Sequence, residues 1–292
     1  MLDYYHILSY AEPQSTEDNE SSLYTHSAKI SSILEIHAKF AAFGDSYAVL
    51  SLHTKTVRSF ADILRLVIAK YPEFATPLGP IIELSQIYQT LDAFHKIVEY
   101  STANEPDVIR YVVALPIDDA TGTVLYMIEE YASPAANDAH IATPPVQELI
   151  ALFTSGNVLA SPPEVNTSPI VANKASQPPP TISANPAIVL AHFEYKPGTL
   201  SHAVEGWKQV VDYVSGNEEE TRGYTVLEDK ETNCVRTVEV YDSWDFVEKV
   251  HLKSAAIGKN QEQNGKDRTG VKGAVHVRAV DGFLGRAERA RI

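Results

Sequence analysis

The sequence has little of several features that mark common protein classes. Cys234 is the only cysteine, so an internal disulfide is impossible and a cysteine-based zinc site is excluded. Basic residues are also outnumbered, with 24 Lys and Arg against 38 Asp and Glu and a net charge of −14. This balance repels phosphate backbones, and no basic stripe interleaved with aromatic residues offsets it. We therefore expect no nucleic-acid partner, and we interpret Cys234 as a small apolar strand residue.

Long apolar runs are missing as well. No run approaches the roughly 18 residues that a membrane-spanning helix needs. The first residues, MLDYYHILSY, lack the basic region and apolar core of a signal peptide. Together with the single cysteine, this composition predicts a soluble cytoplasmic protein without a membrane partner. The apolar fraction of 44% over 292 residues is enough to form the cores of about two domains.

An internal repeat organises the chain. VEYSTANEPDVIRY at Val98–Tyr111 aligns without gaps to VDYVSGNEEETRGY at Val211–Tyr224, with five identities in fourteen positions, where about one is expected by chance. The alignment continues and pairs Glu129, Tyr131, Ser133 and His140 with Glu239, Tyr241, Ser243 and His251. A third copy of part of the pattern lies at Tyr5–Pro13, which resembles Tyr126–Pro134. The chain is therefore predicted to hold repeated units.

The last unit is predicted to have the element order β-α-β-β-α-β. Its helices show apolar residues at helical spacing, and Ser243 stands where a helix N-cap belongs. The expected elements are a strand at Ala187–Tyr195, a helix from Leu200 to about Val214, strands at about Gly223–Glu228 and Cys234–Tyr241, a helix after Ser243, and a strand at Ala274–Val280.

Earlier segments repeat this pattern less completely. The middle unit is expected to have a strand near Ile81–Tyr88, a helix near Leu91–Tyr100, a hairpin across Val108–Tyr131 and a helix after Pro134. The first residues offer a strand, a helix near Lys29–Phe43, a strand at Tyr47–His53 and an unassigned helix at Phe60–Ala69. Ser161–Pro186 is rich in Pro, Ser and Asn and has no apolar periodicity, so it predicts a linker. The predicted domains are a partial unit plus connecting helix at 1–79, a unit at 80–160, the linker at 161–186, a unit at 187–283 and a tail at 284–292.

The fold class follows from this order. A unit with two helices on one side of an antiparallel sheet leaves the other sheet face uncovered, and two such units can cover each other. We therefore predict an α+β protein whose ferredoxin-like βαββαβ units pair as an α/β barrel with a partly polar interior. In the strand that ends at Tyr241, we expect Val238 and Val240 to face the helices. The partial first unit would expose strand edges, which predicts a homodimer.

The passage from strand to helix carries a family resemblance. EVYDSWDFVEKVHLKS at Glu239–Ser254 and EEYASPAANDAHIAT at Glu129–Thr143 both have the order Glu-x-Tyr-x-Ser followed by a helical His. The chain resembles the antibiotic biosynthesis monooxygenase family of the dimeric α/β-barrel superfamily, more completely over Ile188–Val280 than over Ile81–Leu159. The superfamily also contains isomerases, decarboxylases, haem-binding enzymes and members without a known reaction.

The resemblance implies an activity and a set of site residues. The reaction would be oxygenation of a phenol or anthrone of the polyketide type by molecular oxygen, without metal, flavin or other cofactor. It needs a base, hydrogen-bond donors for the developing anion and an apolar wall. The candidate residues are His192, His251 and Tyr241 for catalysis and Asn217, Tyr224, Glu239, Trp207 and Trp244 for binding the small aromatic substrate.

Alternatives remain at each position. Trp207 fits a helix core, Glu239 and Tyr241 fit a structural hydrogen-bonded pair, and His251 fits a satisfied helix histidine. His192 has no histidine counterpart in the middle unit, which would agree with a single active unit. The chain could instead be a non-catalytic binding or scaffold protein, or an isomerase or cyclase on the same fold. A barrel interior filled by side chains would favour the scaffold.

Overall fold

The computed structural model describes residues 2–9, 79–119, 124–155 and 158–287. By internal contacts the chain divides into one compact unit of residues 1–11, 97–147 and 159–292 and another of residues 12–96 and 148–158. The elements are β1 (Leu2–Ser9), α3 (Gly79–Asn104), β2 (Val108–Pro116), β3 (Val124–Tyr131), α4 (Pro134–Ile141), α5 (Pro144–Thr154), β4 (Glu164–Ala175), the 3₁₀ turn η2 (Ile182–Ala184), β5 (Ala187–Tyr195), α6 (Leu200–Asn217), β6 (Thr221–Asp229), β7 (Cys234–Tyr241), α7 (Trp244–Lys249), the turn η3 (His251–Lys253), α8 (Ala255–Asn264), the turn η4 (Gly265–Asp267) and β8 (Arg268–Phe283).

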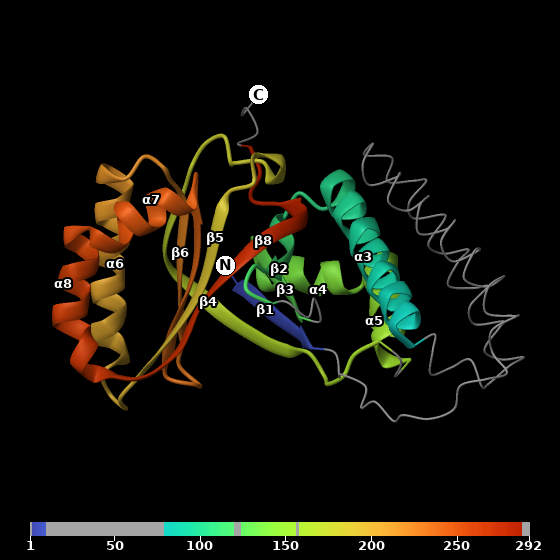
Figure 1. Ribbon diagram of the computed structural model, residues 1–292, viewed down its shortest axis with the longest axis horizontal. Helices are drawn as coiled ribbons and strands as arrows, with labels where there is room; N and C mark the ends of the chain where they lie inside the picture. The colour runs from blue at the N-terminus through green and yellow to red at the C-terminus, as the bar shows by residue number, and fades with distance from the viewer. Residues whose placement is uncertain (1, 10–78, 120–123, 156–157, 288–292) are drawn as a thin grey trace, which may run out of the picture. The chain divides into compact units, whose positions relative to one another are not determined.

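The strands of the first unit form a closed barrel within one chain (Figure 1). Their order around the barrel is β1-β3-β2-β8-β5-β7-β6-β4, and each of the pairings is antiparallel. This order contains two runs, β4-β1-β3-β2 and β8-β5-β7-β6. In each run the strand that comes last in the chain, β4 or β8, lies beside the strand that comes first, β1 or β5. That is the strand order of a ferredoxin-like βαββαβ sheet, so the predicted α+β class and barrel are confirmed. We call β1 to β4 the first half and β5 to β8 the second half.

Helices α6, α7 and α8 lie together on the outer side of the second half (Figure 1). One face of α6 is apolar at helical spacing, and it packs on the sheet because burial removes that face from water. Ser243 caps α7 as predicted, since its hydroxyl accepts a hydrogen bond from the Phe246 amide at 3.2 Å. Ser133 caps α4 in the same way, with the Ala136 amide at 3.1 Å.

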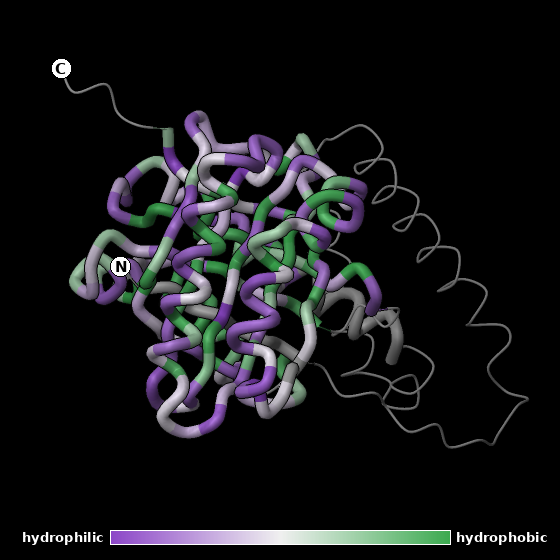
Figure 2. The backbone as a smooth tube through the Cα atoms, turned by 90° about the vertical axis from the view of Figure 1, so that its left-hand side faces the viewer, coloured by the Kyte–Doolittle hydropathy of each residue, from purple (hydrophilic) through white to green (hydrophobic). Residues whose placement is uncertain are grey.

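The faces of the strands divide the core in two. Val189 and Tyr195 of β5 pack with α6, whereas Ile188 and Leu190 pack with residues of β2, β3 and β8 inside the barrel. Figure 2 shows hydrophobic and hydrophilic stretches alternating along the backbone tube, with many hydrophilic stretches in its outer loops. The prediction that Val238 and Val240 face the helices was wrong, because both belong to the interior cluster. Every residue of β7 is buried, so polarity alternation could not distinguish its two faces.

Two secondary-structure expectations and the expectation of an exposed strand edge differ from the structure. Residues 81–88 lie in helix α3, because short apolar runs fit a buried strand and a helix equally well. Half of the expected linker is strand β4, which has few buried residues and so lacks the apolar pattern of a core strand. Strand β1 is paired on both edges, with β3 and β4, so the exposed edge that motivated the homodimer is absent there. The elements expected at 29–43, 47–53 and 60–69 lie outside the described residues.

Among the described helices, none combines the length and the hydropathy needed to cross a membrane.

Candidate functional site

A histidine and a glutamate are in contact at the C-terminal end of α6. His251 lies in η3 directly after α7, and Glu218 is the first residue after α6. The Nδ1 atom of His251 lies 2.8 Å from Oε2 of Glu218. The same carboxylate oxygen accepts a hydrogen bond from Oγ1 of Thr221 at 2.8 Å. The imidazole is therefore held in one orientation by a carboxylate that is itself fixed.

The protonation of this pair follows from the groups around it. Burial alone would raise the pKa of Glu218, but the hydrogen bond and charge of His251, the hydrogen bond from Thr221 and the nearby charge of Lys174 outweigh burial and lower it. Glu218 is therefore ionised near neutral pH and can only accept hydrogen bonds. We accordingly assign a proton to Nδ1 of His251, which leaves Nε2 as the ring nitrogen that is not bound to Glu218.

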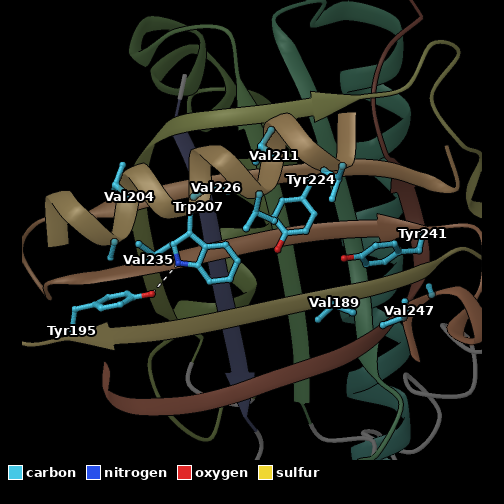
Figure 3. Packing of buried hydrophobic residues seen from close by; sticks show 14 of the residues in the cluster. Val189, Tyr195, Val204, Trp207, Val211, Tyr224, Val226, Val235, Tyr241 and Val247 are labelled. Atoms are coloured by element: carbon cyan, nitrogen blue, oxygen red, sulfur yellow. Dashed lines mark hydrogen bonds between the residues drawn. The ribbon is translucent and has the colours of Figure 1, made fainter. Parts of the chain in front are cut away.

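Two tyrosines enclose the imidazole. The ring centroids of Tyr241 and Tyr224 lie 5.0 and 5.5 Å from that of His251. The Tyr241 hydroxyl donates to Oε2 of Glu239 at 2.7 Å, and the Thr237 hydroxyl donates to Oε1 at 2.7 Å. Burial and the Glu239 carboxylate raise the pKa of both tyrosines, so both are neutral phenols. Figure 3 shows Tyr224 and Tyr241 on the helix-facing side of the sheet.

The first half contains the same arrangement. Nδ1 of His140 lies 3.0 Å from Oε2 of Glu105, which also accepts a hydrogen bond from Ser101 at 2.6 Å. The rings of Tyr111 and Tyr131 each lie 5.4 Å from the ring of His140. The Tyr131 hydroxyl donates to Glu129 at 2.8 Å, as Tyr241 does to Glu239. We call His140–Glu105 and His251–Glu218 the two dyads. Each glutamate–tyrosine pair is the hydrogen-bonded pair that the sequence repeat suggested.

The remaining predicted binding residues lie apart from the dyad. Trp207 is 3% exposed on α6, and its indole N–H donates to the Tyr195 hydroxyl at 2.9 Å, the dashed line in Figure 3. Trp244 stacks on His276 with 4.8 Å between ring centroids and lines a pocket of about 330 Å³ with Arg278. Asn217 is exposed and donates to the Tyr213 carbonyl at 2.8 Å.

His192 belongs to the other face of the sheet. It follows Ile188 and Leu190 at the two-residue period of β5, which puts it on the interior face of the barrel. Its Nε2 lies 3.5 Å from Oε1 of Glu194. The two predicted bases, His192 and His251, therefore do not share a site. Strand register assigns Ile7 as the counterpart of His192, because Ala187 and Leu2 hold equivalent places opposite Tyr241 and Tyr131.

A buried ion pair inside the barrel was not predicted. Nη2 of Arg110 on β2 lies 2.7 Å from Oε2 of Glu130 and 3.0 Å from Oγ1 of Thr225 on β6. In the barrel order β2 and β6 lie on opposite sides, so Arg110 reaches across the interior. The repeat aligns Arg110 with Gly223 and Glu130 with Val240, so the pair occurs in one half alone. The sequence signal available for this ion pair was the presence of charged residues in two largely apolar strands.

Many of the other interior side chains are apolar. They form a cluster with residues from β2, β3, β5, β6, β7 and β8. Among the described residues, no three His, Cys, Asp or Glu side chains converge where a metal ion could bind. Neither the Trp244 pocket nor a second pocket of about 510 Å³ beside Phe283 is lined by a residue of a dyad.

Comparisons with known proteins agree with this geometry. A candidate monooxygenase from Lactobacillus acidophilus superposes with a TM-score of 0.57 at 16% identity, covering 68% of this chain and 90% of that one. A second, from Fusobacterium nucleatum, gives a TM-score of 0.58 at 18% identity, covering 69% and 89%. At these identities the likeness shows the fold alone. No curated protein matches the chain. The family model described as antibiotic biosynthesis monooxygenase matches residues 86–152, which contain the His140–Glu105 dyad. The resemblance seen in the sequence is therefore confirmed for residues 86–152, which match the antibiotic biosynthesis monooxygenase family.

Proposed function

We propose that the protein is a cofactor-independent oxygenase of the antibiotic biosynthesis monooxygenase type, which oxidises an electron-rich phenol or anthrone with molecular oxygen. One observation carries the proposal. His251 is oriented through Nδ1 by the ionised Glu218 and is enclosed by two neutral tyrosines. A histidine held by a carboxylate is the common form of a general base, and neutral phenols are hydrogen-bond donors. The family match over residues 86–152 supports the same class of reaction.

The reaction assigned to these groups begins with proton removal and continues with reduction of molecular oxygen. Nε2 of His251 takes a proton from the anthrone methylene, and the aromatic rings of the substrate delocalise the charge of the resulting anion. The anion reduces molecular oxygen. Converting the methylene to a quinone carbonyl releases four electrons, one oxygen atom enters the carbonyl, and the other leaves as water. The substrate thus supplies every electron, and the protein supplies the base.

The test is oxygen uptake with a model anthrone in metal-free buffer. His251→Ala is expected to lower the rate at least tenfold, as removal of a general base does. His140→Ala removes the same interactions from the other half, so comparison of the two variants shows which dyad supplies the base. His251→Gln retains a polar group for Glu218 and serves if the alanine variant fails to fold. No uptake by the folded native protein above that of buffer would overturn the proposal.

His192 remains the second candidate for the base. His192→Ala belongs in the same experiment, since His192 and His251 lie on opposite faces of the sheet. If the rate falls for His192→Ala and not for His251→Ala, the reaction takes place inside the barrel. An isomerase or cyclase would convert its substrate under nitrogen and consume no oxygen.

A binding or scaffold role is the second candidate function. The observation that favours it is the packed interior, where apolar side chains of both halves form one cluster. The duplicated dyads agree with an architectural role, since identical contacts in both halves would stabilise both. The homodimer also stays a prediction. Light scattering at micromolar concentration tests it, and a monomeric mass would refute it.

A further inference from the structure

A lysine of the first half binds the end of a helix in the second half. Lys174 lies at the end of β4, and its Nζ donates to the carbonyl of Val214 at 2.8 Å and to that of Glu218. These carbonyls belong to the last turn of α6 and the residue after it. The last carbonyls of a helix have no partner within the helix, and they form the negative end of its dipole. A cation there is stabilising.

An arginine of the second half does the same for the first half. Arg286 follows β8, and its Nη2 donates to the carbonyls of Ser101 and Glu105 at 2.8 Å each. Its Nε also donates to the carbonyl of Val108. The guanidinium lies 4.5 Å from the ring centroid of Phe283, which limits its movement.

The two contacts are equivalent by the sequence repeat. Val98–Tyr111 aligns with Val211–Tyr224 without gaps, so Ser101 corresponds to Val214 and Glu105 to Glu218. β4 and β8 hold the same place in the two strand orders. Each half therefore contributes one cation to the same pair of carbonyls in the other half, Lys174 from the end of β4 and Arg286 from just after β8. A lysine and an arginine at these two places have the same partners although their side chains differ.

The second carbonyl in each pair belongs to the glutamate that orients a histidine. Fixing the backbone of Glu218 fixes where its carboxylate meets Nδ1 of His251. We propose that Lys174 and Arg286 are positioning residues, each holding the glutamate of a dyad from the opposite half of the barrel, so that each dyad takes its geometry only when the two halves have closed. The consequence for catalysis rests on the proposed oxygenase function, whereas the positioning itself does not.

The charged groups near Lys174 are engaged in a way that keeps Lys174 as the cation at the two carbonyls. Arg222 lies close enough to affect the charge of Lys174, but its guanidinium is bound to both carboxylate oxygens of Asp242, at 2.8 and 2.7 Å. Glu219 is the other charged neighbour that acts on Lys174 in addition to Glu218. Burial lowers the pKa of Lys174, which agrees with a lysine directed inward at carbonyl groups.

The test reads each dyad separately by the ¹⁵N chemical shifts of the imidazole nitrogens, which report the tautomer of a histidine. Lys174→Met is expected to change the shifts of His251 and leave those of His140 unchanged, and Arg286→Met is expected to do the reverse. Lys174→Arg and Arg286→Lys should restore the native shifts. Lys196→Met is the matched control, since Lys196 also donates to a carbonyl, that of Lys266 at 2.7 Å, away from both dyads.

Two results would overturn the proposal. If each methionine variant disturbs both histidines equally, the cations contribute general stability alone, and if neither variant disturbs its histidine, they do not position the dyads. Lys174→Gln, which can still donate to a carbonyl, replaces the methionine variant if that fails to fold. Where the native protein consumes oxygen, Lys174→Met should lower the rate at least tenfold and Lys174→Arg should recover it. Absence of oxygen uptake would refute the oxygenase and leave the NMR result intact.

Discussion

His251 and Glu218 are joined by a contact of 2.8 Å between Nδ1 and Oε2 in which the two side chains are 1% and 2% exposed. A carboxylate with a lowered pKa contributes stability that is present above its usual pKa and is lost as the pH falls through the lowered value. We therefore expect Glu218→Gln to lower the free energy of unfolding at pH 7 by about 1–3 kcal/mol. The difference from the native protein should shrink towards pH 3. Urea unfolding at both pH values measures it, and a constant difference would contradict the assigned ionisation.

The tyrosine that contacts each buried glutamate offers a paired prediction. Tyr241→Phe removes a hydroxyl from Glu239 and leaves a buried carboxylate with one donor fewer. The expected loss of stability is about 1–3 kcal/mol. Tyr131→Phe does the same to Glu129 in the other half and should cost a similar amount. Thermal unfolding of both variants checks this, and a neutral result at both positions would show that the hydroxyls do not stabilise the glutamates.

The Arg110–Glu130 pair inside the barrel can be tested by comparing a single substitution with a double substitution. Its residues are 5% and 2% exposed, and Nε and Nη1 of Arg110 have no acceptor among the described side chains. Glu130→Ala leaves a buried guanidinium without its carboxylate and should cost about 3–5 kcal/mol. The double variant Arg110→Met, Glu130→Met should cost less than Glu130→Ala, because no charge remains buried. A double variant less stable than the single variant would refute this account.

Asp229 and Arg236 form an ion pair at the end of the β6–β7 hairpin. Burial would raise the pKa of Asp229, but hydrogen bonds from Thr232 and Arg236 lower it to about 2. The pair should contribute about 1–2 kcal/mol above pH 4 after screening by solvent, and this contribution should disappear between about pH 4 and pH 2. Asp229→Asn measures it by urea unfolding. Native and variant proteins that lose stability in parallel over that range would contradict the prediction.

The sequence predicted the features that depend on nearby residues. The Ser133 and Ser243 caps and the hydrogen-bonded pairs Glu129–Tyr131 and Glu239–Tyr241 each involve positions two or three apart in the chain. Such contacts form wherever a strand or the first turn of a helix has the right residues. The family resemblance rests on the same short segments.

Tertiary structure decided the features that depend on residues distant in the chain. β1 closes the first half and residues 81–88 are helical, although the short apolar pattern fits either state. Tertiary packing also put His192 and His251 on opposite faces, because the face that meets the helices is chosen by contacts with α6. Arg110 reaches Thr225 and Lys174 reaches Glu218 across 115 and 44 residues of chain. Local sequence carries no signal for such pairs, since the closed barrel is what brings their strands together.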